Sequence, residues 1–179
     1  MNERTEAVLL TGLFGVGKST VAADMANLLE TSGTTYAALD LDWLTWTNAG
    51  GPTRADEHRI MLTNLATIVR NYADVGVTRF VLARSIRDRH EQETIATAIA
   101  MPLRTVELTL PYHELARRLA TDPTAERQEN LAHSREWLTE DLGTGFADLT
   151  IANDRAVRAV SIEITMWLGW LPRPDAAQP

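Results

Sequence analysis

The sequence predicts a three-layer α/β fold, in which a five-stranded, mostly parallel sheet is covered by helices on both faces. Two observations carry this prediction. Short apolar segments alternate with longer amphipathic segments along the chain, which is the pattern of consecutive strand–helix–strand units. In addition, the first apolar segment runs into a glycine-rich turn, and an amphipathic helix follows that turn directly.

The five expected strands are short apolar runs bounded by turn residues or by the start of a helix. They cover residues 7–11, 36–39, 79–83, 105–110 and 146–151. The first two are continuous apolar runs, as expected of strands that are buried on both faces of a sheet. The fourth alternates apolar and polar residues at its start.

Helices are expected between the strands and after the last of them, because apolar residues recur three or four positions apart. The first covers residues 18–30, and Gly33 follows it as a stop signal. A long second helix ends at Gly76, and a third covers residues 88–100. Pro111 opens a fourth helix as a first-turn proline. The last expected helix includes Val157, Val160, Ile164, Trp167 and Leu168.

The length of the chain favours one domain, which we expect to span residues 1–171. The polar, charged segment 122–141 is expected to be mainly helical and to form a short lid over a site. Residues 172–179 are expected to form a frayed tail.

The composition argues against several classes of function. The net charge of −7 disfavours a nucleic-acid or anionic-membrane partner. The absence of cysteine excludes disulfide scaffolds and thiol catalysis. The sequence has neither a run of apolar residues long enough for a membrane span nor a secretion signal. A cytoplasmic monomer or homodimer is therefore expected.

The glycine-rich turn matches the pattern G-x-x-x-x-G-K-[ST] of a phosphate-binding P-loop, or Walker A motif. Glycines bring backbone N–H groups close to a polyphosphate, and the helix that follows favours an anion at its N-terminus. Lys18 is expected to contact the β- and γ-phosphates, and Ser19 to ligate Mg²⁺. The predicted nucleotide-binding residues of the motif are Gly12, Leu13, Phe14, Gly15, Val16, Gly17, Lys18, Ser19 and Thr20.

Two carboxylates follow the second expected strand. Asp40 and Asp42 stand two residues apart, so they would lie on one side of the chain if the backbone stayed extended. The carboxyl ends of parallel strands face the ligand crevice of an open α/β sheet. We therefore expect Asp42 to accept a proton from a substrate hydroxyl and Asp40 to lie on the Mg²⁺ side. Trp43 and Trp46 are candidate walls of a substrate pocket.

Arginines in the second half of the chain are candidates for stabilising the charge of a transferred phosphoryl group. Arg118 and Arg127 are the two chosen for that role, although a solvated helical face is the alternative for both. Arg84 and Ser85 end the third expected strand, where they would contact substrate, although Ser85 is equally well placed to cap the next helix. The histidines show no spacing typical of metal ligands.

Together these features resemble the P-loop kinases with the nucleoside-monophosphate-kinase-like fold, such as adenylylsulfate kinase, gluconate kinase and chloramphenicol phosphotransferase. The matching features are the segment 12–20, the Asp40/Asp42 pair, Ser85 and the arginines of the lid. The resemblance implies ATP and Mg²⁺ as cofactors, a lid, and a substrate pocket beside Asp42. It also implies that Asn153 lies in the loop near the adenine.

The resemblance does not supply the substrate. The substrate segments of adenylylsulfate, shikimate and gluconate kinases are missing from this sequence. The expected function is therefore transfer of the γ-phosphate of Mg-ATP to a hydroxyl of an unidentified small molecule. Two alternatives stay open, a regulatory ATPase or GTPase-like protein without a small-molecule acceptor, and a toxin-like nucleotide-sugar kinase.

Overall fold

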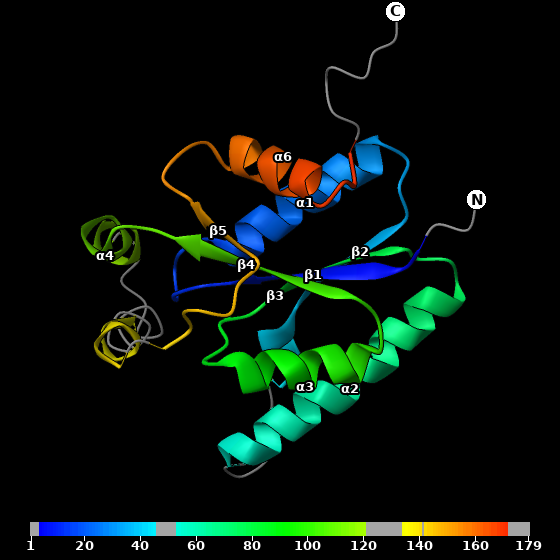
Figure 1. Ribbon diagram of the computed structural model, residues 1–179, viewed down its shortest axis with the longest axis horizontal. Coiled ribbons are helices and arrows are strands. Elements are labelled where there is room, and N and C mark those ends of the chain that lie inside the picture. The colour runs from blue at the N-terminus through cyan, green and yellow to red at the C-terminus, as the bar shows by residue number, and fades with distance from the viewer. Residues whose placement is uncertain (1–3, 46–52, 121–133, 141, 172–179) are drawn as a thin grey trace, which may run out of the picture.

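A computed structural model describes residues 4–45, 53–120, 134–140 and 142–171 of the chain. It contains one sheet of five parallel strands in the order β2-β3-β1-β4-β5 (Figure 1). The strands are β1 (Glu6–Thr11), β2 (Tyr36–Asp40), β3 (Arg79–Ala83), β4 (Leu103–Thr109) and β5 (Leu149–Ala152). In the central register, Leu9 of β1 lies opposite Leu82 of β3 and Thr105 of β4. The predicted fold class is confirmed.

Helices cover both faces of this sheet, as Figure 1 shows. α1 (Lys18–Thr31) and α6 (Val157–Trp167) lie on one face, and α2 (Arg54–Asp74) and α3 (Arg89–Ile99) lie on the other. α4 (Tyr112–Ala120) lies beyond the carboxyl end of β4, close to a short helical segment at residues 134–139. A 3₁₀ turn, η1 (Leu41–Leu44), follows β2 directly.

The central strand explains the two hydrophobic cores. Along β1, Val8 and Leu10 pack into the core beneath α1 and α6, whereas Ala7 and Leu9 pack into the core beneath α2 and α3. Successive side chains of a strand point to opposite faces of the sheet, so a strand with both faces buried must be apolar throughout. The carboxyl end of β1 is thereby fixed at the centre of one edge of the sheet.

β1 and β2 each extend one residue beyond the prediction, to Glu6 at the start of β1 and to Asp40 at the end of β2, and β4 and β5 differ more. β4 starts at Leu103 and ends at Thr109, so it lies two residues earlier at its start than the predicted 105–110. β5 starts at Leu149 rather than at Phe146. Just before it, Asp148 is joined to Thr105 of β4 by two hydrogen bonds, from the Asp148 backbone N–H to the Thr105 backbone oxygen at 2.8 Å and from the Thr105 backbone N–H to the Asp148 side chain at 2.7 Å.

The predicted lid at 122–141 can be compared only at its end, where residues 134–139 are helical. Its remaining part, residues 122–133 and 141, lies outside the described residues, as does the predicted tail at 172–179. No helix in the described part of the chain has the length and apolar character needed to cross a membrane.

Candidate functional site

The P-loop joins β1 to α1 at the carboxyl edge of the sheet. Its three glycines all have a positive φ, of 127° at Gly12, 80° at Gly15 and 103° at Gly17. At Gly12 the need for glycine is also steric, because a Cβ atom there would lie 2.3 Å from the backbone oxygen of Leu108 in β4. The loop is therefore packed tightly against the neighbouring strand, which fixes where its backbone N–H groups lie.

Lys18 lies inside this loop. Its ammonium group donates hydrogen bonds to the backbone oxygens of Gly12 at 3.1 Å and Leu13 at 3.0 Å, and it lies 5.6 Å from the centre of the Phe14 ring. Burial lowers the pKa of Lys18 to about 8, against the raising effect of Asp42 and Asp40. A buried ammonium group that donates to neutral carbonyl oxygens can instead donate stronger hydrogen bonds to an anion such as a phosphate.

The lowered pKa of Lys18 predicts that nucleotide affinity falls in alkaline solution. Only the ammonium form attracts a polyphosphate, and the nucleotide-free protein loses this proton around pH 8. The Kd for ATP should therefore rise about fivefold between pH 8 and pH 9. Calorimetric titrations at a series of pH values measure this change. Lys18→Met should bind weakly and show no such dependence; an unchanged wild-type Kd across the range would contradict the prediction.

Ser19 and Asp40 form a pair of oxygen donors beside the loop. The Ser19 hydroxyl donates a hydrogen bond of 2.6 Å to Asp40 Oδ2, while Asp40 Oδ1 accepts from the backbone N–H of Asp42 at 3.1 Å and so caps η1. A hydroxyl and a carboxylate are hard oxygen ligands of the kind that Mg²⁺ takes together with phosphates and water. Within the described residues, no group of three or more His, Asp or Glu side chains could hold a metal without such additional ligands.

The two carboxylates after β2 do not lie along an extended strand, which corrects the prediction. The chain turns into η1 at Leu41, so Asp40 ends the strand and Asp42 lies within the 3₁₀ turn. Asp40 faces Ser19, whereas Asp42 Oδ1 forms a 2.7 Å ion pair with Nη1 of Arg84 at the end of β3. The turn thus gives two neighbouring carboxylates different partners.

Asp42 is in an environment that favours proton exchange. The Asp42 side chain is 59% exposed, and partial desolvation by the surrounding protein raises the pKa of its carboxyl, while the positive charge of Arg84 acts in the opposite direction. Both side chains line a cavity of about 450 Å³ that also reaches Phe14 of the P-loop. A carboxylate with a raised pKa beside a cavity is a candidate general base.

The cavity is completed by α2 and α3, which the sequence did not associate with the site, and by residues 134–139, the helical end of the predicted lid. Glu57 and His58 come from α2, Glu91 comes from α3, and Glu136 and Trp137 come from the helical segment 134–139. Arg87, between β3 and α3, also lines it. Trp137 is 5% exposed, with its ring 5.7 Å from that of Phe14 in an edge-to-face arrangement.

The other predicted substrate residues are placed differently. Ser85 lines the cavity, but it is buried and its hydroxyl donates a 2.8 Å hydrogen bond to the backbone oxygen of Gly12. Ser85 therefore holds the start of the P-loop. Trp43 is 65% exposed and does not line this cavity. Trp46 and Arg127 lie outside the described residues.

Asn153 and Arg118 contact each other beside the P-loop. The Asn153 side chain is 2% exposed and donates a 2.7 Å hydrogen bond to the backbone oxygen of Val16. Its own backbone oxygen accepts a 2.9 Å hydrogen bond from Arg118. Arg118 also lies 3.6 Å from Glu114, so its guanidinium is held beside the loop by α4 and by the segment after β5. The Asn153 side chain therefore holds the backbone of the P-loop at Val16.

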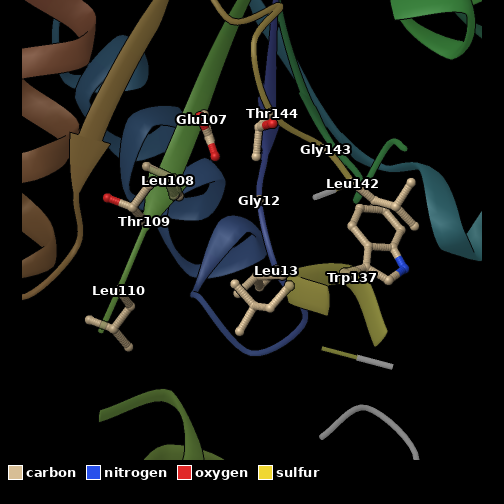
Figure 2. Close-up of a pocket in the computed structure, with 11 residues that line it drawn as sticks. Gly12, Leu13, Glu107, Leu108, Thr109, Leu110, Trp137, Leu142, Gly143 and Thr144 are labelled. Atoms are coloured by element: carbon tan, nitrogen blue, oxygen red, sulfur yellow. The ribbon is translucent and has the colours of Figure 1, made fainter. Parts of the chain in front are cut away.

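A second cavity, of about 250 Å³, lies between the start of the P-loop and β4 (Figure 2). Figure 2 shows the side chains of Leu13, Leu110 and Trp137 around it, with Glu107 on the side of β4. Burial raises the pKa of Glu107, which accepts a hydrogen bond from Thr150. Trp137 lines both cavities and separates a mainly apolar space from the polar one beside Asp42.

Comparisons with known proteins agree with this architecture. No family model matches the sequence. A stretch of 76 residues is 40% identical to a probable adenylyl-sulfate kinase of Aeropyrum pernix, and this match spans 42% of each chain. An unliganded sugar kinase from Janibacter sp. HTCC2649 superposes with a TM-score of 0.67 at 18% identity, over 92% of this chain and 95% of that one.

The Mycobacterium tuberculosis APS kinase CysC, solved in complex with AMPPNP and APS, superposes with a TM-score of 0.62 at 22% identity, over 93% of this chain and 98% of that one. Similarity at this level of identity establishes the fold. The fold expected from the resemblance, that of the P-loop kinases, is therefore confirmed.

Proposed function

We propose that this protein transfers the γ-phosphate of Mg-ATP to a hydroxyl group of a small molecule. One observation carries the proposal. Phe14 of the P-loop, whose ring lies 5.6 Å from the Lys18 ammonium, lines the same 450 Å³ cavity as the Asp42–Arg84 ion pair. A phosphate site and a candidate base beside one cavity are the two parts that phosphoryl transfer to a hydroxyl requires.

In the proposed reaction the acceptor hydroxyl lies in the cavity and attacks the γ-phosphorus. The new O–P bond forms as the bond from phosphorus to the oxygen bridging it to the β-phosphate breaks, and ADP leaves with that electron pair. The hydroxyl proton passes to the Asp42 carboxylate. Arg84 orients Asp42 through their 2.7 Å ion pair, and Lys18 offsets the charge that develops on the phosphate oxygens.

The residues beside the P-loop fit Mg-ATP. The Ser19 hydroxyl and the Asp40 carboxylate would hold the metal, directly or through water, and the metal would neutralise phosphate charge. Thr20 and the backbone of the loop would contact the phosphates. Arg118 would reach the nucleotide from α4, and Arg127 is proposed as a further cation of the lid.

The comparisons support a kinase without naming its acceptor. The relative from Aeropyrum pernix is described as a probable adenylyl-sulfate kinase, whereas the Janibacter protein is described as a sugar kinase. Proteins of this fold therefore differ in the molecule they phosphorylate. The acceptor of this chain therefore depends on the residues that line its own cavity.

The proposed activity can be tested by measuring ADP release from Mg-ATP across a panel of hydroxylated metabolites and antibiotics, with the phosphorylated product identified by mass spectrometry. We expect release to depend on the acceptor. Lys18→Met should weaken nucleotide binding and abolish release. Release of ADP and free phosphate at the same rate with and without every acceptor would instead favour a regulatory ATPase.

A further inference from the structure

The charges of the cavity beside Asp42 limit the kind of acceptor it can hold. Four carboxylates and two guanidinium groups line it, namely Asp42, Glu57, Glu91, Glu136, Arg84 and Arg87. The net formal charge of these six groups is therefore −2. An acceptor that carries its own negative charge would enter against this surplus and next to the phosphates of ATP.

Both arginines are already engaged with acidic partners. Arg84 forms the 2.7 Å ion pair with Asp42. Arg87 lies 3.5 Å from a carboxylate oxygen of Glu140, and its guanidinium is 5.8 Å from the centre of the Trp137 ring. The backbone N–H of Arg87 also donates a 2.9 Å hydrogen bond to Glu91. An anionic group would have to displace these contacts in order to gain a cationic partner.

Two exposed glutamates contribute directly to this negative surplus. Glu57 and Glu136 both line the cavity and are exposed to solvent there. Among the described residues, neither carboxylate has an ion pair. They come from α2 and from the segment 134–139, so they enter the cavity from different elements. Both are available to a ligand that brings hydrogen-bond donors or a positive charge.

The walls also favour a polyhydroxylated molecule. His58 is held by a 3.1 Å hydrogen bond to Thr94, and the aromatic rings of Phe14 and Trp137 meet edge to face at the side nearest the P-loop. Carboxylates accept hydrogen bonds from hydroxyl groups, while aromatic rings pack against the C–H faces of a sugar ring. Polar groups on one side and rings on the other suit such an amphipathic acceptor.

From this arrangement we infer that the acceptor is a neutral or amino-bearing polyhydroxylated molecule, such as a sugar or amino sugar, and not a carboxylate, sulfate or phosphate. This inference rests on the proposed phosphotransfer, because it names the substrate class of the same site. In the bound state, Glu57 and Glu136 hold the ammonium or hydroxyl groups while one hydroxyl faces Asp42.

Three polyhydroxylated six-carbon molecules of different charge provide the test. Glucosamine, glucose and gluconate are compared at neutral pH as acceptors, by ADP release, and as ligands of the AMPPNP-loaded protein, by the shift of the Trp137 indole N–H resonance assigned with Trp137→Phe. We expect kcat/KM and affinity to be at least about tenfold higher for glucosamine than for gluconate, with glucose between them.

A double variant and a matched control separate charge from folding. Glu57→Gln with Glu136→Gln should remove the preference for glucosamine over glucose, whereas Glu93→Gln, an exposed position of α3 outside this cavity, should leave it unchanged. Tighter binding or faster phosphorylation of gluconate would overturn the inference while phosphotransfer stands. Binding of glucosamine without any ADP release would uphold the charge preference and refute the transferase. Failure of all three molecules to bind would refute the inference.

Discussion

Asp42→Asn should lower turnover by about 10²- to 10⁴-fold, the usual contribution of a general base, while nucleotide affinity stays near the wild-type value. The amide keeps the shape of the carboxylate and can still accept a hydrogen bond from Arg84, but it cannot take the proton of the attacking hydroxyl. Asp42 lines the acceptor cavity and pairs with Arg84 at 2.7 Å, whereas the metal-side pair is formed by Ser19 and Asp40. Loss of Asp42 should therefore affect chemistry more than nucleotide binding.

The pH profile gives an independent readout of the same residue. Partial desolvation raises the pKa of Asp42, and the base is the deprotonated form, so wild-type kcat/KM should fall as the pH is lowered through that raised pKa. Asp42→Asn should lose this acidic limb. Asp74→Asn, at the exposed end of α2, serves as the control and should leave both rate and profile unchanged. Wild-type turnover in Asp42→Asn would rule out this residue as the base.

Much of the fold was predictable because its signals are local. The continuous apolar run of β1 indicates a strand buried on both faces, and the pattern from Gly12 to Ser19 fixes a strand–loop–helix unit. The start of β5 was not predictable in the same way. The residue before it, Asp148, is hydrogen-bonded to Thr105 of β4, a contact between residues far apart in the sequence.

The site was predictable to the extent that it follows the ends of strands. Asp42 and Arg84 follow β2 and β3, and adjacency of those strands brings them together. Glu57 belongs to α2, which packs on the sheet, and Glu136 belongs to the segment 134–139 near α4; an isolated glutamate on a helix usually means a solvated face. For Ser85 the sequence predicted the position at the site but not the role of the side chain. Its hydroxyl donates a hydrogen bond to the P-loop backbone at Gly12.

Gly12→Ala should lower both stability and nucleotide affinity. The new Cβ would lie 2.3 Å from the backbone oxygen of Leu108, which lies near the carboxyl end of β4, is paired with Ile151 of β5 and cannot move without disturbing the sheet. The φ of 127° adds backbone strain, since residues with a side chain rarely adopt it. We expect a loss of about 3 kcal/mol or more in the free energy of unfolding, or a fall in Tm of about 6–12 °C.

Gly33→Ala is the matched control, because it separates backbone strain from the steric clash. Gly33 ends α1 with a φ of 74°, and no heavy atom lies within 4 Å of the position its Cβ would take. Only the strain remains there, so we expect a loss of about 1 kcal/mol and no change in the Kd for ATP. Thermal unfolding and calorimetric titration measure the two quantities. Equal losses in the two variants would mean that contact with β4 does not fix the P-loop, whereas a larger loss at Gly12, together with weaker ATP binding, would mean that close packing against the sheet positions the phosphate site.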